Sequence, residues 1–336
     1  MNLLILGGTR FLGRHVVEVA LAAGHRVTLF HRGKTNPGLF PQAETILGDR
    51  NSDLSRLAGK RFDAVIDTCA YLPASAARSA ETLADRVGKY LFVSSISVYA
   101  DFSRAGMTEE APLATLPEGA DPAVYQDEHY GALKVLCEQE VARCFGDRAF
   151  LVRPGLIVGP HDPSWRFNYW VERGARGGEV LAPGRPERAV QFIDVRDLAE
   201  WLLHLPEKPG SGGVFNATGP NPPLPFRALL EACLRVSGGP GHLTWVEEEF
   251  LLRQDVSPWS ALPLWLEEGK NGMLQVSIER AQARGLTFRP VQETIAACRE
   301  WHEAHPKGYT GKKATLALER EAEVLAAWRM GRNQPT

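Results

Sequence analysis

The sequence predicts an α/β protein: a doubly wound parallel sheet with a smaller C-terminal lobe. Apolar, strand-like runs alternate with helix-like segments through about the first 160 of its 336 residues. A glycine-rich turn directly follows the first apolar run, and beyond about residue 160 prolines, glycines and tryptophans interrupt shorter elements. Alternation of this kind is typical of β-α-β crossovers, which place helices on both faces of a parallel sheet.

The first elements form one such crossover. Residues 2–7, NLLILG, are continuously apolar, which suits a strand buried on both faces. A helix is predicted at 14–24, ending at a glycine, and a second strand at 25–33. One face of the helix carries Val16, Val17, Ala20 and Leu21.

The same pattern continues to about residue 160. Residues 64–70 and 89–95 have the composition of buried strands, and a helical stretch at 74–88 lies between them. A long amphipathic helix is predicted at 131–146, followed by a strand at 148–159. These segments extend the parallel sheet and its two helical layers.

For three stretches outside this alternation the sequence makes separate predictions. Residues 100–129 are rich in acids and prolines and predict a long loop, and such loops are usually functional or mobile. Four aromatic residues after the last strand either line a cleft or seal the core of the small lobe: Trp165, Phe167, Tyr169 and Trp170. Helical spacing of Leu318, Ala322, Leu325 and Trp328 predicts a final helix that clamps onto the lobe or packs against a second subunit.

Composition excludes several classes of protein. A net charge of −2 gives no electrostatic reason to expect nucleic acid or an anionic membrane as a partner. No apolar stretch approaches the roughly 20 residues of a membrane span, and no signal peptide is recognisable. The five cysteines lack C-x-x-C spacing and the nine histidines lack ligand spacing, so we expect reduced thiols and no metal. These features predict a cytoplasmic protein.

The turn after the first strand, GGTRFLG, has the order expected of a phosphate-binding loop. A strand, a glycine turn and a helix place a helix N-terminus under a pyrophosphate. We expect Gly7 to permit the tight turn, Gly8 to let the backbone approach the ligand, and Gly13 to let the helix pack close to the sheet. A plain strand-to-helix turn is the alternative.

The end of the second strand indicates which dinucleotide would bind. An NAD site usually carries an acid there, whereas this chain has His31 and Arg32, with Lys34 beyond. Cationic donors suit a 2′-phosphate, and Arg10 is a further candidate for that contact. NADP(H) is therefore favoured over NAD(H); a solvated basic turn is the alternative.

Three more residues have the spacing of a catalytic set. Ser95 ends a buried strand, at the edge where α/β sheets place their ligands. Tyr130 and Lys134 are four residues apart, which puts both side chains on one face of a helix.

These motifs resemble the extended branch of the short-chain dehydrogenase/reductase superfamily, that is, NAD-dependent epimerase/dehydratase-like proteins with a Rossmann fold. The segments that carry the resemblance occur in the family's order: GGTRFLG, ILGDR, DAVIDTCAY, VSSISVYA, HYGALK, VQFIDVRDLAEWL and GGVFNATGP. The loop itself is similar to an atypical subgroup with GGxxxxG spacing, which includes chloroplast RNA-binding proteins.

The resemblance implies roles for the matching residues. Tyr130 would be the general acid/base, Lys134 would favour its phenolate and bind the nicotinamide ribose, and Ser95 would hold the substrate oxygen. The implied cofactor-binding residues are Gly7, Gly8, Thr9, Arg10, Phe11, Leu12, Gly13, His31, Arg32, Lys34, Asp49, Arg50, Thr68, Cys69, Ala70, Tyr130, Lys134 and Pro154.

Two further departures from the family concern the active site. No asparagine occurs between Asn51 and Asn168, so the asparagine of the usual proton relay is missing. Arg185 and Arg188 are out of register with the arginine that holds a diphosphate in sugar-nucleotide members, and either reach such a group or lie on an exposed loop.

The sequence thus predicts an NADP(H)-dependent oxidoreductase acting on a carbonyl/alcohol carbon of a small molecule. A sugar-nucleotide epimerase or dehydratase with tightly held NAD(P), and a non-catalytic nucleotide- or RNA-binding scaffold, are the alternatives. We expect a dinucleotide-binding core at 1–160, a substrate lobe at 161–308 interleaved with core elements at about 188–218, and a helical tail at 309–336. A homodimer without nucleic-acid or membrane partners is expected.

Overall fold

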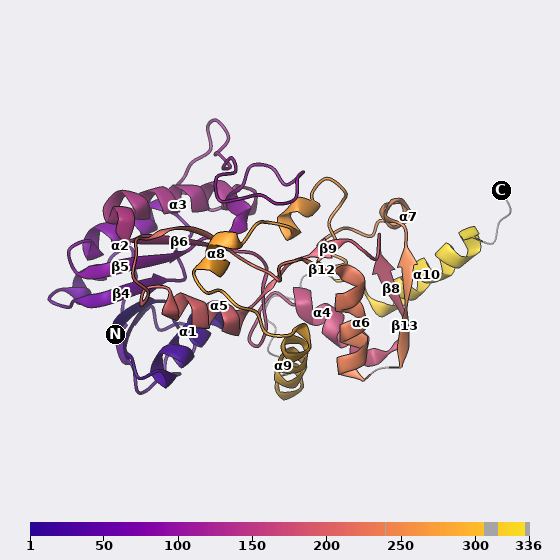
Figure 1. Ribbon diagram of the computed structural model, residues 1–336, viewed down its shortest axis with the longest axis horizontal. Helices are drawn as coiled ribbons and strands as arrows, with labels where there is room; N and C mark the ends of the chain where they lie inside the picture. Colours follow the sequence, from indigo (N-terminus) through magenta and orange to yellow (C-terminus); the bar gives the residue numbers. More distant parts are fainter. Residues whose placement is uncertain (239, 306–314, 333–336) are drawn as a thin grey trace.

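A seven-stranded, fully parallel sheet forms the centre of the N-terminal half (Figure 1). The computed structural model describes residues 1–238, 240–305 and 315–332. The strand order is β3-β2-β1-β4-β5-β6-β11. The strands are β1 Asn2–Leu6, β2 Arg26–His31, β3 Glu44–Leu47, β4 Phe62–Asp67, β5 Val87–Val93, β6 Ala149–Pro154 and β11 Gly213–Ala217. Because the chain winds outward in both directions from β1 and β4, a crevice is expected between their carboxyl ends.

Helices cover both faces of this sheet. Helices α1 (Phe11–Ala22) and α5 (Val195–His204) pack together on one face, and α2 (Pro73–Leu83) and α3 (Tyr130–Phe145) on the other. Alternate residues of β1 enter the two resulting cores, Leu3 and Ile5 on the α1 side and Leu4 and Leu6 on the α2 side. The continuous apolar run of this strand therefore reflects burial on both faces, and the doubly wound prediction is confirmed.

Two predicted elements differ from the structure by more than a few residues at an end. The helix expected at 74–88 ends at Leu83, because Val87 already pairs with Phe62 as the first residue of β5. The strand expected at 148–159 divides at Gly155 into β6 and a short strand, β7 (Ile157–Val158). Strand β7 pairs with β10 (Ile193–Asp194) outside the main sheet.

The smaller lobe lies beside the sheet (Figure 1) and has its own apolar core. Its helices are α4 Arg166–Arg176, α6 Phe226–Ser237, α7 Glu248–Arg253, α9 Val291–Ala304 and α10 Leu318–Arg332. Its paired strands are β8 Gly178–Pro183 with β13 Gly241–Val246, and β9 Ala189–Val190 with β12 Leu224–Pro225. The short helix α8 (Glu279–Ala283) packs instead against β11. The aromatic residues Trp165, Phe167, Tyr169 and Trp170 are buried in this core, which favours the sealing role over the cleft-lining one.

The last helix docks on the lobe through a face that differs from the predicted one. Of the four predicted residues, Leu325 is buried in the lobe core and Trp328 packs against that core, whereas Leu318 and Ala322 are exposed and Val324 is buried instead. The register differs because α10 buries a charged residue, Glu321, which spacing of apolar residues could not reveal. Residues 306–314 and 333–336, parts of the predicted lobe and tail, lie outside the described residues. Within the described chain no helix is long and apolar enough to cross a membrane.

Candidate active site

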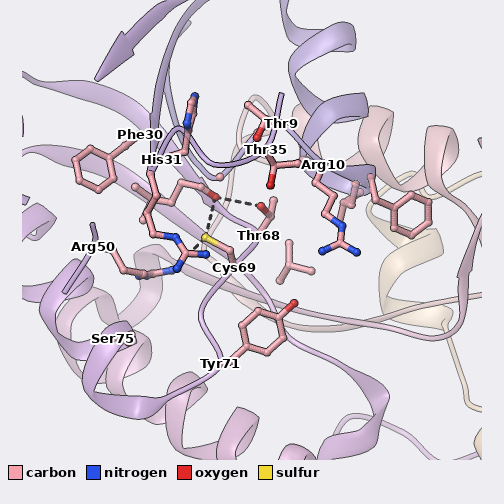
Figure 2. Close-up of a pocket in the computed structure, with 18 of the residues that line it drawn as sticks. Thr9, Arg10, Phe30, His31, Thr35, Arg50, Thr68, Cys69, Tyr71 and Ser75 are labelled. Carbon is pink, nitrogen blue, oxygen red and sulfur yellow. Dashed lines mark hydrogen bonds between the residues drawn. The ribbon is translucent and has the colours of Figure 1, made fainter. Parts of the chain in front are cut away.

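A cavity of about 710 Å³ opens at the carboxyl edge of the sheet, where the loops after β1 to β6 converge with the start of α3 (Figure 2). Every site residue predicted from the sequence lines this cavity except Ala70. Ala70 lies behind it, where its carbonyl oxygen accepts a hydrogen bond from Lys134 Nζ at 2.9 Å. The fold therefore brings the predicted set together in one place.

The glycine turn forms one wall of the cavity and has little room for side chains. Gly7 has φ +103°, and a Cβ there would lie 2.7 Å from Thr68 Oγ1. A Cβ on Gly13 would lie 2.8 Å from the backbone nitrogen of Gly8. At Gly8 a Cβ would point at Leu29, so this residue is needed for packing and not only for approach of a ligand. These close contacts form a cradle of bare backbone at the start of α1.

Arg10 replaces a glycine at no cost to the backbone. Its φ of −141° is extended, a conformation that any residue adopts, and the positive φ values of the turn fall on Gly7, Gly8 and Phe11. Arg10 caps α1 without a side-chain hydrogen bond, and the first turn of α1 contains no acidic residue. The N–H groups and positive end of this helix are therefore available to an anion such as a pyrophosphate.

The Arg10 guanidinium extends toward the side of the cavity where Tyr71 lies, away from His31 (Figure 2). Burial raises the pKa of the Tyr71 phenol, and the charge of Arg10 partly opposes that rise. Arg10 therefore lies close enough to Tyr71 to interact with it. Within the described chain Arg10 makes no ion pair.

The residues after β2 form the opposite end of the cavity. His31 accepts a hydrogen bond from the Gly33 amide at Nδ1, and burial lowers its pKa, so its imidazole is neutral at pH 7. Arg32 and Lys34 are exposed and make no ion pair with any described residue. The positive charge at this end of the cavity comes from Arg32 and Lys34, and His31 contributes a neutral ring.

Arg50 reaches the floor of the cavity but is held there by a buried carboxylate. Its two terminal nitrogens contact the Asp67 carboxylate at 2.9 and 2.6 Å, and Tyr90 donates a hydrogen bond to the same group at 2.8 Å. Although burial opposes it, the Arg50 charge lowers the pKa of Asp67 and keeps it ionised. This pair braces β4 against the loop after β3, so the guanidinium is already neutralised.

The three residues of the predicted catalytic set meet at the other end of the cavity. Lys134 is buried on α3 and donates hydrogen bonds to the carbonyl oxygens of Ala70 and Val93, at 2.9 and 2.7 Å. Two of its three N–H groups are thereby fixed, which leaves one for another acceptor. Ser95 begins the short 3₁₀ helix Ile96–Val98, and its hydroxyl accepts a hydrogen bond from the Ser97 amide at 3.1 Å.

The titration of these groups reflects burial. Burial raises the pKa of Tyr130 to about 12, and a hydrogen bond with Ser95 partly opposes this. Burial also lowers the pKa of Lys134 to about 8. In the protein alone Tyr130 is therefore a protonated phenol, suited to donating a proton.

Sequence reasoning missed several residues that line the cavity. They are Leu6, Phe30, Gly33, Thr35, Gly48, Asn51, Tyr71, Leu72, Ser75, Val93, Ser94, Gly155, Ile157 and Pro163. Most are immediate neighbours of predicted residues, so extending each motif by one or two positions would have found them. Within the described residues no three His, Cys, Asp or Glu side chains are grouped to hold a metal ion.

Comparison with known proteins places this geometry in a family. The model of the NAD dependent epimerase/dehydratase family matches residues 3–218. The chloroplast stem-loop binding protein of 41 kDa b from Arabidopsis thaliana is 26% identical over 264 residues, which are 71% of this chain and 64%, less than two thirds, of that protein.

A second curated relative is the Bos taurus sterol-4-alpha-carboxylate 3-dehydrogenase, decarboxylating, which is 26% identical over 68% of each chain. Among solved structures, a protein of Burkholderia cenocepacia J2315 described as a candidate epimerase superposes with a TM-score of 0.68 at 19% identity. That match covers 90% of this chain and 98% of the other. It shows the shared fold.

Proposed function

The chain belongs to the NAD-dependent epimerase/dehydratase family, a family of NAD(P)-dependent enzymes, and we propose that it is an NADP(H)-dependent oxidoreductase. Its substrate is a small molecule with a carbonyl or secondary alcohol carbon. The observation that carries this proposal is the convergence of Tyr130, Lys134 and Ser95 on one cavity with the glycine cradle.

The residues present fit a dinucleotide. The bare backbone at Gly7 to Gly13 and the uncapped start of α1 would hold the pyrophosphate, and the remaining N–H of Lys134 would hold the nicotinamide ribose. Arg32 and Lys34 would hold the 2′-phosphate of NADP(H). When bound, the nicotinamide supplies or accepts the hydride.

The side chains then move the proton. In reduction the carbonyl carbon gains the hydride, while the carbonyl oxygen gains the proton of the Tyr130 hydroxyl and becomes an alcohol. Ser95 orients that oxygen beside Tyr130, and the Lys134 ammonium stabilises the phenolate that remains until solvent returns the proton. Oxidation of an alcohol runs through the same steps in reverse.

The first test is cofactor binding. Titration with NADPH and NADH, followed by nicotinamide fluorescence, should show tighter binding of NADPH. Arg32→Ala should reduce the affinity for NADPH by about tenfold and leave the affinity for NADH nearly unchanged, because only NADPH carries the 2′-phosphate that this guanidinium would bind. Arg253→Ala, which removes an exposed arginine of α7, is the matched control. Equal affinity for both cofactors, or no effect of Arg32→Ala, would refute the NADP(H) preference.

The second test concerns Tyr130. Tyr130→Phe should leave the dissociation constant for NADPH within about twofold and reduce turnover of a carbonyl substrate by about 10²-fold or more, the usual range for loss of a general acid. Turnover at the wild-type rate in Tyr130→Phe would remove this residue from the chemistry.

Two rival functions give different outcomes. The first rival function is a scaffold that binds RNA, which the similarity to a stem-loop binding protein suggests. RNA binding by such a scaffold would not change in Tyr130→Phe. A sugar-nucleotide epimerase would interconvert its substrate without net consumption of NADPH. Arg185 and Arg188 do not line the cavity, so neither is placed to hold the diphosphate of a substrate bound there. Arg188 is buried and contacts Glu248 at 2.7 Å, and Arg185 is exposed and pairs with Glu268 at 2.8 Å.

A further inference from the structure

Three tyrosines from separate segments meet at the mouth of the cavity. Tyr71 follows β4, Tyr125 belongs to the irregular segment 100–129, and Tyr130 begins α3. The ring centroids are 6.1 Å apart for Tyr71 and Tyr125, 6.4 Å for Tyr71 and Tyr130, and 6.5 Å for Tyr125 and Tyr130. The hydroxyl proposed to move the proton therefore sits within an aromatic cluster.

Two of these rings are unusually exposed. Half of Tyr71 and 45% of Tyr125 are accessible to solvent, as is 47% of the neighbouring Val124. The other large apolar side chains exposed in the described chain, Leu47, Leu252, Leu318 and Met330, lie elsewhere, on β3, α7 and α10. An apolar patch confined to the rim of a site is typical of a ligand-binding surface.

The rings of the cluster are uncharged and have charged neighbours on the side of the cavity. Tyr125 donates a hydrogen bond to the Asp127 carboxylate at 3.1 Å, which orients the ring. Two cations face Tyr71: Arg10, from the glycine turn, and Lys134, whose Nζ lies 5.8 Å from the centre of the Tyr71 ring. Arg185 and Arg188, the two arginines that the sequence offers for a diphosphate, do not line the cavity. The exposed part of the rim is thus formed by uncharged rings, which suit an apolar group, and Arg185 and Arg188 are not there to hold a nucleoside diphosphate.

We propose that Tyr71 and Tyr125 bind an apolar alkyl or aromatic group attached to the reacting carbonyl or alcohol carbon, and so select substrates of that class. The inference rests on the proposed oxidoreductase function, which places the reacting oxygen at Tyr130. An aromatic ring or alkyl chain on that carbon would then lie over Tyr71 and Tyr125 and bury their exposed rings from solvent.

The test compares ketones that differ only in the group beside the carbonyl. NADPH oxidation is measured with 2-butanone, 2-octanone and acetophenone, and we expect kcat/KM for at least one of the larger ketones to exceed that for 2-butanone by about tenfold or more. Tyr71→Ser and Tyr125→Ser should each reduce that ratio severalfold. Tyr125→Phe keeps the ring and should keep the ratio, and Leu252→Ser, an exposed apolar residue on α7, should change nothing.

Binding of 2-octanone and acetophenone to the NADPH-loaded protein, measured by saturation-transfer NMR, separates the two proposals. If the wild type binds either ketone, Tyr125→Ser does not, and no variant oxidises NADPH, then the apolar site stands and the oxidoreductase function fails. If all ketones are reduced with the same ratio in wild type and serine variants, the oxidoreductase function stands and the apolar site is overturned. The site is also overturned if the serine variants only convert a dimer to a monomer, because the patch is then a subunit interface.

Discussion

At the residue scale, the proposed site contains side chains that are charged yet buried. Lys134 is the clearest case, because its ammonium is enclosed and held by two carbonyl oxygens. It also lies 4.1 Å from the centre of the Phe92 ring. These contacts keep the amine in position while burial makes its charged form costly.

Lys134 should therefore give stability a specific pH dependence. Its pKa is about 8 in the folded protein and 10.5 as a free side chain, so between these values the unfolded chain binds more protons. Its contribution to stability is then unfavourable below about pH 8 and should improve by about 3 kcal/mol as pH rises to 10.5. Urea unfolding should be measured for wild type and Lys134→Met at pH 7.5 and 10.5. We expect the unfolding free energy of the wild type to rise relative to that of Lys134→Met at the higher pH.

Lys89→Met serves as the control for that experiment, since Lys89 also donates to backbone carbonyls, those of Pro206 and Lys208, but is only half-buried. A difference between wild type and Lys134→Met that does not change with pH would contradict the titration of Lys134.

The Arg50–Asp67 pair should be structural. Asp67→Asn leaves the buried guanidinium without its partner and should cost about 3 kcal/mol of unfolding free energy. The double variant Arg50→Met/Asp67→Leu should recover part of that loss, because no unpaired charge remains. Asp85→Asn, at an exposed position, is the control. Chemical denaturation checks all of these, and an effect below about 1 kcal/mol in Asp67→Asn would show that the pair is readily solvated.

At the element scale, the turn between β1 and α1 links packing to ligand binding. The helix begins so close to the strand that Gly13 touches the backbone of Gly8, and the same closeness exposes the N–H groups of the first turn to the cavity. A side chain at either glycine would therefore move the helix end away from any bound pyrophosphate.

Gly13→Val should reduce affinity for NADPH by about tenfold or more and cost about 1–3 kcal/mol of stability, because its Cβ would meet backbone that has no room to shift. Gly331→Ala on α10 meets nothing within 4 Å and should leave both unchanged. Fluorescence titration and thermal unfolding provide the measurements. Wild-type affinity in Gly13→Val would show that the turn does not hold the cofactor.

At the scale of the whole molecule, the protein has two cores joined beside one cavity. The sheet core positions the glycine turn and the proposed catalytic set, whereas α10 closes the lobe core. In α10 the buried Glu321 accepts hydrogen bonds from Arg173 at 2.6 Å and from the Leu181 amide at 2.8 Å. These hydrogen bonds attach α10 to α4 and β8.

Glu321→Ala should therefore destabilise the lobe by about 3 kcal/mol, since it leaves the buried Arg173 without its carboxylate. Affinity for NADPH should stay within about twofold, because the cofactor cavity draws its lining from the sheet side. Glu323→Ala on the exposed face of the same helix is the control. Thermal unfolding and cofactor titration are the measurements, and a large loss of cofactor affinity in Glu321→Ala would show that the two cores are energetically coupled.

The sequence by itself determined the doubly wound sheet, the glycine turn and the Ser95–Tyr130–Lys134 set. Each depends on local order along the chain, such as a strand followed by a turn and a helix, or a four-residue spacing on one helix face. Such local features do not depend on how the elements pack together, and the sequence alone could therefore predict them.

Only the tertiary structure decided the rest. Burial lowers the pKa of His31 and keeps its ring neutral. The ion pair of Arg50 with Asp67, the buried face of α10 and the contact of Tyr71 with Tyr125 depend on residues that lie apart in sequence. Burial and partner charge set the protonation and availability of each side chain, and neither quantity is encoded in local spacing. The motifs therefore identified where chemistry could occur, and packing determined which groups remain free to perform it.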